Sequence, residues 1–136
     1  MWKEPKVNWV KTDYFNYEDY NRIKNNVKYL RKLALVLYLN FKYEEMGDDK
    51  TGYSDFPYAS EFDRIESNLE SIKNNSYQFY LSGTKRWYGN QPTLDYQDLN
   101  RIESACLSMY EGLNNQLKAK DRLSIRLGYQ RGAVRA

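Results

Sequence analysis

The sequence contains no histidine and only one cysteine, Cys106, among its 136 residues. Without histidine the chain lacks the commonest general base and the commonest metal ligand of proteins. A Ser-His-Asp triad, a Cys–His pair and a histidine-based zinc site are therefore excluded, and we expect no enzyme, no metal and no cofactor. A single cysteine cannot form an internal disulfide, and its place in an apolar helical phase predicts a small core residue rather than a nucleophile.

Long apolar runs are also missing from the chain. The longest, Leu33 to Leu39, is too short to span a bilayer. The opening "MWKEPKVNWV" lacks the apolar core of a signal peptide, so we expect no export signal and no membrane partner. The segment "GDDKTG" at residues 47–52 has neither the order of a phosphate-binding loop nor that of a calcium loop, which favours a polar turn. The length favours one domain.

Aromatic residues are plentiful, with 14 Tyr, 5 Phe and 3 Trp. Tyrosine is common at partly hydrated surfaces and at interfaces, because it has an apolar ring and a polar hydroxyl. The codons of an AT-rich genome would also favour tyrosine, and the sequence leaves both explanations open. The connection over residues 77–92 is densest in aromatics and is a candidate platform for sugar. Trp2 and Trp9 lie in a short segment with one proline, and we expect them either to fold back onto the body or to clasp a neighbouring subunit.

The C-terminal segment from Lys118 is basic. It holds six basic residues and one acidic residue within a net charge of +3, so the rest of the chain is slightly acidic. Its interleaved apolar residues favour docking on another protein; a disordered solubilising tail and, less favoured, nucleic-acid binding remain open. The residues expected to bind partners are Trp2, Trp9, Arg122, Ile125, Arg126, Leu127, Tyr129 and Arg131.

Three stretches carry apolar residues at spacings of three and four, which is typical of amphipathic helices. The first is expected to start after an Asn16 cap and to run for about 28 residues, until the polar turn "MGDDKTG". The second is expected to start near Tyr58 or Ser60 and to end at about Asn75. The third is expected to start after a Thr93 or Asp95 cap and to reach about Leu117. The three apolar stripes are Tyr20, Ile23, Val27, Leu30, Ala34, Leu37 and Phe41; Phe62, Ile65, Leu69 and Ile72; and Leu99, Ile102, Cys106, Met109 and Leu113.

Each of these stretches opens with the same phrase: "EDYNRIKNN", "SEFDRIESN" and "YQDLNRIESA". An acid precedes the arginine by three places, and an isoleucine follows it directly. The repeated residues are Asp19, Arg22 and Ile23; Glu61, Arg64 and Ile65; and Asp98, Arg101 and Ile102. The residue before the arginine is Asn21, Asp63 or Asn100. The residue two places after the arginine is Lys24, Glu66 or Glu103. The residue four places after it is Asn26, Asn68 or Ala105.

The spacing of the phrase has a local meaning, because an acid three places before an arginine lies on the same face of a helix. An exposed pair of this kind contributes only a few tenths of a kcal/mol. We therefore expect each arginine to bridge to a carboxylate or backbone group of a second helix and to pin the start of its neighbour. Duplication of a helix-opening unit that sets registry explains the repetition best; a binding surface made by the three arginines is the less favoured alternative.

The third copy, with Trp87 upstream and "TLDYQDLNRIE" at residues 93–103, resembles a helical module of minor structural proteins of tailed phages of Gram-positive bacteria. It is similar to segments of their tail-tip, baseplate and fibre proteins. "WVKTDYFNYEDYNRIKNN" and "DFPYASEFDRIESN" are further copies, so the resemblance covers most of residues 9–117. The chain departs from the pattern at Lys24, where glutamate is expected, and has no obvious fibre or receptor domain. The resemblance implies assembly rather than catalysis.

We therefore expect an all-α three-helix bundle over residues 13–117, with an extended N-terminal arm (1–12) and an extended, basic C-terminal arm (118–136), although a strand or a helix is equally compatible with the last segment. The expected function is that of a virion structural protein of the tail tip, baseplate or fibre-attachment region, assembled in the host cytoplasm. Its partners would be other virion proteins and further copies in a ring. The alternatives are a head or head–tail joining protein and a small nucleic-acid-binding regulatory protein.

Overall fold

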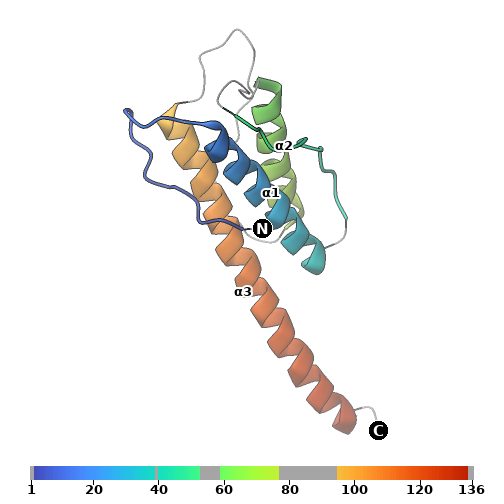
Figure 1. Cartoon of the computed structure of the whole chain (residues 1–136). Coiled ribbons are helices and arrows are strands. Elements are labelled where there is room, and N and C mark those ends of the chain that lie inside the picture. Colours follow the sequence, from blue (N-terminus) through green and yellow to red (C-terminus); the bar gives the residue numbers. More distant parts are fainter. Residues whose placement is uncertain (1, 39, 53–58, 77–94, 135–136) are drawn as a thin grey trace.

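The protein folds as a bundle of three helices (Figure 1). The computed structural model describes residues 2–38, 40–52, 59–76 and 95–134, with side chains up to Arg122 apart from that of Ala59. The helices are α1 (Tyr17–Leu37), α2 (Ala59–Asn75) and α3 (Tyr96–Val134), and the described ranges contain no strand. The expectation of an all-α three-helix bundle is confirmed. No described helix has the length and apolar character needed to cross a membrane.

The core is formed by the apolar stripes of the three helices. The stripes expected for α2 and α3 are buried in full, as are the first five residues of the α1 stripe, Tyr20 to Ala34. Trp9, from the N-terminal segment, and Met46, from the α1–α2 connection, complete this core. The three motif isoleucines, Ile23, Ile65 and Ile102, are at most 1% exposed, which fixes the helix face that each motif turns inward.

Helices α1 and α3 begin with the same cap. The Asn16 side chain accepts a hydrogen bond from Asp19 N, and Asp19 accepts one in return from Asn16 N, which is a capping box. Asp95 and Asp98 form the same reciprocal pair at the start of α3. Asn16 and Asp95 are therefore the caps, as expected, whereas Tyr58 and Thr93 lie outside the described residues.

Helix α1 is shorter than the expected 28 residues. It ends at Leu37, and Tyr38 is extended, with φ −127° and ψ 161°. The apolar pattern continues to Phe41, which packs against the core from outside the helix. Arg31 donates hydrogen bonds to the Asn40 side chain and to the Phe41 carbonyl, so tertiary contacts hold the chain after it leaves the helix.

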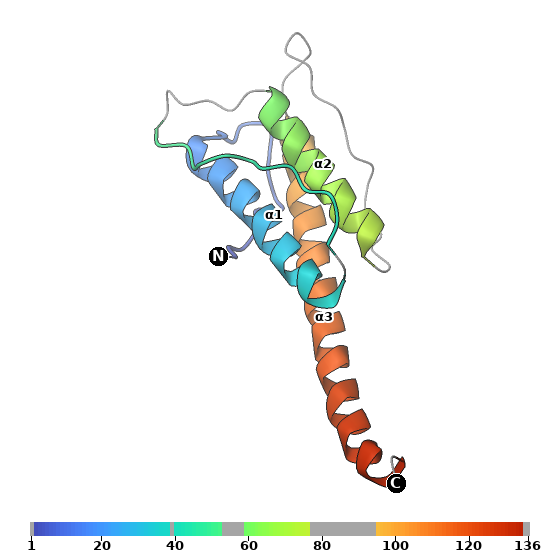
Figure 2. The same ribbon diagram turned by 90° about the vertical axis from the view of Figure 1, so that its right-hand side faces the viewer.

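Helix α3 is longer than expected, and the prediction of an extended C-terminal arm is wrong. The helix does not end at Leu117 but continues to Val134, beyond the ends of α1 and α2 (Figures 1 and 2). Residues 117–127 contain no proline or glycine and are rich in leucine, lysine and arginine, which are good helix formers. Helix propensity therefore outweighs the short alternation of "RLSIRL" that suggested a strand.

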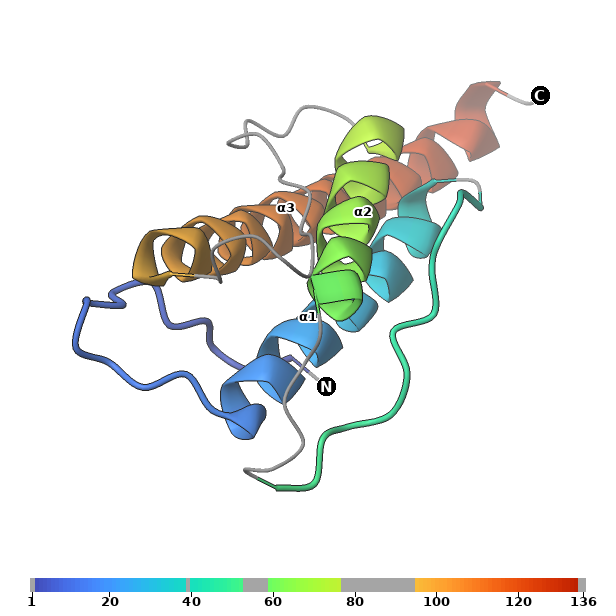
Figure 3. The same cartoon turned by 90° about the horizontal axis from the view of Figure 1, so that it is seen from above.

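Two extended segments cover the bundle on separate faces (Figure 3). We call residues 2–9 arm 1 and residues 43–50 arm 2. Arm 1 precedes α1, and arm 2 precedes α2. Each arm buries one side chain near its middle, Pro5 in arm 1 and Met46 in arm 2. Both arms therefore belong to the packed body, and neither hangs free from it.

Candidate functional site

Two motif arginines bridge to a glutamate of another helix, as the sequence predicts. Arg22 of α1 donates from Nε and Nη2 to the two carboxylate oxygens of Glu103 in α3, at 2.9 and 2.8 Å. Arg101 of α3 donates from Nη1 and Nη2 to Glu66 of α2, at 2.5 and 3.0 Å. Both glutamates are 1% exposed. Such buried forked pairs are geometrically demanding, so they fix how neighbouring helices face each other.

The described contacts between α1 and α2 include no such pair. Arg64 of α2 is exposed, and the position on α1 that would hold its partner is occupied by Lys24. Lys24 is 2% exposed and turns to the chain that follows α1: its ammonium group donates to Gly47 O at 3.2 Å and to the carboxylate of Asp49. That ammonium group holds the pKa of the Asp49 carboxyl below its usual value. The prediction of an interhelix bridge thus holds at two of the three motifs.

The acids three places before the arginines differ in their roles. Asp19 completes the capping box of α1 and contacts Arg22 at 2.8 Å. Asp98 forms the reciprocal pair with Asp95 at the start of α3 and lies 3.8 Å from Arg101. Burial alone would lower the pKa of the Arg22 guanidinium, but its hydrogen bonds and charge interactions with Glu103 and Asp19 together outweigh burial and raise that pKa. In the second copy the acid, Glu61, instead accepts from Tyr20 of α1 at 3.1 Å and pairs with Lys50 of arm 2 at 2.8 Å.

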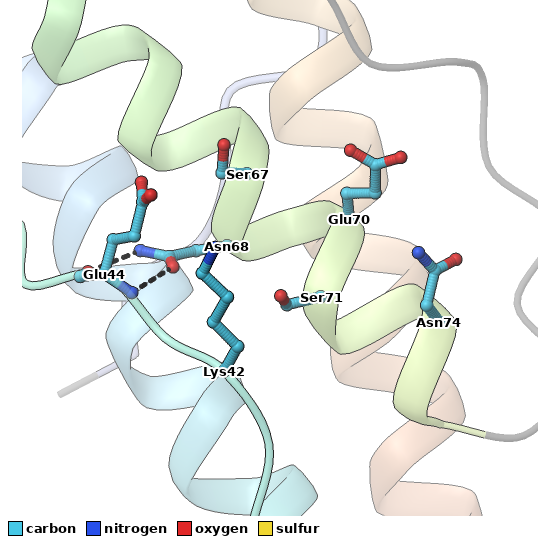
Figure 4. Close-up of a pocket in the computed structure, with 7 residues that line it drawn as sticks. All are labelled: Lys42, Glu44, Ser67, Asn68, Glu70, Ser71 and Asn74. Carbon is cyan, nitrogen blue, oxygen red and sulfur yellow. Dashed lines mark hydrogen bonds between the residues drawn. The ribbon is translucent and has the colours of Figure 1, made fainter.

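The asparagine four places after the arginine binds an arm by its backbone. Asn26 of α1 accepts from Lys3 N at 2.9 Å and donates to Lys3 O at 2.8 Å. Asn68 of α2 accepts from Glu44 N and donates to Glu44 O, both at 2.8 Å (Figure 4). We call such a two-way pair a clamp. Both asparagines are 1% exposed, so the clamps satisfy amides that are shielded from water.

The asparagine directly before the arginine makes a second set of clamps. Asn100 of α3 accepts from Trp9 N at 2.7 Å and donates to Trp9 O at 2.9 Å. Asn21 of α1 accepts from Lys50 N at 2.8 Å and donates to Lys50 O at 2.9 Å. Within each arm the second clamped residue follows the first at the same spacing. The two arms therefore bind the bundle in the same register.

Aromatic contacts at the start of each arm repeat as well. Trp2, just before the first clamped residue of arm 1, stacks on Tyr110 of α3 with ring centroids 4.0 Å apart. Tyr43 holds the same place in arm 2 and lies under the guanidinium of Arg31 in α1, 4.4 Å from the ring centroid. Tyr110 and Arg31 occupy equivalent positions after their motif arginines. The repeating unit is therefore an arm and a helix together, longer than the phrase visible in the sequence.

The contacts run in one cyclic direction around the bundle. Arm 1 is clamped to its own helix, α1, and to the preceding helix of the cycle, α3; arm 2 is clamped to α2 and to α1. The arginines follow the same rule, since α1 reaches back to α3 and α3 reaches back to α2. Two arms and two arginine bridges therefore share one direction around the bundle. The connection that precedes α3, with its aromatic residues, lies outside the described residues.

The expected partner-binding residues fall into two groups. Trp9 is 3% exposed and donates from its indole to Glu103 at 2.5 Å, and Trp2 packs on Tyr110. Of the two expectations for these tryptophans, folding back onto the body is confirmed. Arg122 is exposed on α3. The remaining expected residues lie on the helical stretch whose side chains the structure does not describe: Ile125, Arg126, Leu127, Tyr129 and Arg131.

Sequence reasoning missed the clamps, although a signal was present. Asparagine recurs at the two clamp positions, as Asn21 and Asn100 before the arginine and as Asn26 and Asn68 after it. A buried asparagine at a fixed place in a repeat needs a polar partner. Its side-chain amide can accept a hydrogen bond from the backbone N–H of one residue and donate one to the C=O of the same residue. The arms themselves share almost no sequence, because a clamp hydrogen-bonds to the backbone of the arm and not to its side chains.

The described residues offer few candidates for a metal site or a reactive side chain. No group of three or more metal-ligating side chains occurs among them. Cys106 is buried, and its burial raises the pKa of its thiol. A polar groove of about 300 Å³ lies beside the Asn68 clamp (Figure 4), and a smaller one of about 120 Å³ lies at the equivalent positions of α1. The larger groove is lined by Lys42, Glu44, Ser67, Asn68, Glu70, Ser71 and Asn74, and the smaller by Asn25, Lys28, Tyr29 and Lys32.

Among the described residues, the geometry defines a class of protein: a three-helix bundle in which two extended arms are each clamped between two helices. Searches with this chain found no matching family model, no matching curated protein and no matching solved structure. Its function is therefore inferred from the molecule itself.

Proposed function

We propose that this protein is a structural component of a phage virion, which acts as an assembly or adaptor part of the tail tip, baseplate or fibre-attachment region. The observation that carries the proposal is the mode of joining, in which each described arm is clamped to the preceding helix of the cycle. Buried ionic bridges and backbone clamps are devices for fixing position and registry. The resemblance of the motif to phage structural modules points the same way.

The continuation of α3 is the element best placed to contact partners. It extends past the bundle (Figure 2). Lys118, Lys120 and Arg122 are exposed on it. Other virion proteins are the proposed partners, with copies arranged in a ring around the particle axis. The chain would be assembled into particles in the host cytoplasm.

The test is mass spectrometry, with copy-number determination, of purified particles of the phage that carries this gene. Presence at a fixed low multiple, such as three, six or twelve copies per particle, would support a tail or portal-axis component. Absence from particles, together with abundance in infected cells, would refute the proposal. A chain lacking residues 118–136 provides a second test, because it keeps both arms and should fold but fail to enter particles.

A second candidate function is nucleic-acid binding by the same basic continuation of α3. The exposed side chains of Lys118, Lys120 and Arg122 favour it. Binding to DNA that weakens steeply with salt, and that is lost on deletion of residues 118–136, would support this function. A head or head–tail joining protein would be found in particles too, and mass spectrometry of separated heads and tails distinguishes it from a tail component.

A further inference from the structure

We call the helix surface that an arm is clamped to through the asparagine before the motif arginine its docking groove: the surface around Asn100 and Glu103 for arm 1, and the surface around Asn21 and Lys24 for arm 2. These two grooves differ in the charge of one buried residue. Glu103 of α3 and Lys24 of α1 both stand two places after their motif arginine, and they are 1% and 2% exposed. Both reach the arm at the same place, three residues after its first clamped residue. Glu103 accepts a hydrogen bond from Lys6 N at 3.1 Å, whereas Lys24 donates one to Gly47 O at 3.2 Å. The same contact is thus made with opposite hydrogen-bond polarity.

Each arm is adapted to the residue that it meets. Arm 1 presents donors to Glu103, because the Trp9 indole adds its N–H at 2.5 Å to the amide of Lys6. Arm 2 presents acceptors to Lys24, namely the Gly47 carbonyl and the Asp49 carboxylate. Gly47 has φ +79°, which glycine adopts readily and other residues rarely do, so the backbone of arm 2 differs from an ordinary extended strand at this point.

The clamps cannot choose between the arms. Each clamping asparagine binds the N–H and C=O of one arm residue, and every residue except proline offers both groups. Chain connectivity brings each arm near its own groove, and a chemical difference between the grooves would add specificity to this match.

We propose that the residue two places after the motif arginine is this device: Glu103 selects an extended segment that presents donors, and Lys24 selects one that presents acceptors. In the wrong groove, arm 1 would place N–H donors against the Lys24 ammonium group, and arm 2 would place oxygen acceptors against the Glu103 carboxylate. A buried charge would then lose its partners, which is strongly unfavourable. The grooves are in this sense two peptide-binding sites of opposite specificity. The inference concerns how the units are joined and does not rest on the virion proposal.

The substitution Lys24→Glu distinguishes this proposal from a simpler interpretation. If Lys24 is only a drift from the glutamate of the other copies, restoring glutamate would offer Arg64 a partner and leave stability unchanged or improved. If Lys24 selects arm 2, the introduced carboxylate would face Asp49 and the Gly47 carbonyl, and the unfolding equilibrium constant in urea should rise by about 10- to 100-fold. Lys32→Glu, two turns further along α1 and exposed, is the matched control. Equal effects of the two substitutions would overturn the proposal.

An arm exchange tests selectivity directly in the full chain. Residues 44–50 are replaced by the sequence of residues 3–9, which has the same length and the same clamp spacing. This chimera should be less stable than the natural chain while Lys24 is present, and Lys24→Glu should now stabilise it, reversing the sign of its effect. A purely structural role of Lys24 would not reverse that sign. If Lys24→Glu fails to improve the chimera, including the case in which neither version folds, the proposal is wrong.

Discussion

Glu103 is the residue whose loss should reveal most about how the units are joined. Its carboxylate is 1% exposed and accepts four hydrogen bonds: two from Arg22, one from Lys6 N and one from the Trp9 indole. Glu103→Gln keeps the shape, but it removes the charge and replaces one accepting oxygen by a donating NH₂ group. The remaining amide oxygen can accept two hydrogen bonds, so two of the four donors must lose their partner, and Arg22 keeps only Asp19 as an ionic partner among its described contacts.

The expected loss follows from these contacts. Breaking a buried ion pair on one side costs about 3–5 kcal/mol. Arg22 keeps 17% of its side chain exposed and retains Asp19, so we expect the lower end, about 3 kcal/mol of unfolding free energy. Glu66→Gln, which loses contacts to Arg101, should cost about 2 kcal/mol. The exposed Glu111 provides the control, since Glu111→Gln should change stability by about 0.5 kcal/mol or less.

The assay is urea unfolding followed by tryptophan fluorescence and far-UV circular dichroism. With a slope typical of small proteins, about 1–3 kcal/mol per molar urea, the Glu103→Gln midpoint should fall by about 1–3 M urea. The two probes should report the same midpoint if arm and bundle unfold together. A shift no larger than that of Glu111→Gln would refute the view that this carboxylate holds α1, α3 and arm 1 together.

Three further outcomes are expected. Asn26→Ala should lower the unfolding free energy by about 1–3 kcal/mol, because Lys3 loses both backbone partners; a matching change at the exposed Asn115 should have little effect in the same urea assay. Cys106 should not react with a thiol reagent at pH 8 in the native protein and should react fully in urea, because burial raises the pKa of its thiol. The pKa of Asp49 is lowered in the folded state, so its contribution is complete above the unfolded-state pKa, near 3.9. That contribution should disappear as the pH falls through the lower folded-state pKa, and Asp49→Asn should flatten this part of the stability–pH curve.

Helix positions and the inward faces could be predicted from the sequence because they depend on local periodicity. The stripe from Phe62 to Ile72 and the stripe from Leu99 to Leu113 are buried as predicted. The interhelix role of Arg22 and Arg101 was also predictable, because an exposed local pair is too weak to explain a threefold repeat.

Helix ends and the arms could not be predicted, since they depend on contacts between distant parts of the chain. Helix α1 ends at Leu37 although its apolar pattern continues, and Asn68 and Asn21 hold the segment that follows. The clamps impose no sequence on the arms, so arm 1 and arm 2 give no recognisable repeat. The departure at Lys24 was visible, but its meaning required the position of Gly47.

The most direct test of the docked arms is residue-resolved amide hydrogen exchange by NMR in the native protein. We expect slow exchange at the clamped amides of Lys3, Trp9, Glu44 and Lys50, although the arms have no regular secondary structure. Exposed neighbours such as Val7 and Asp48 should exchange fast. If the clamped amides exchange as fast as those of an unfolded chain while the helices stay protected, the arms are not docked and the account of arm-and-helix units is wrong.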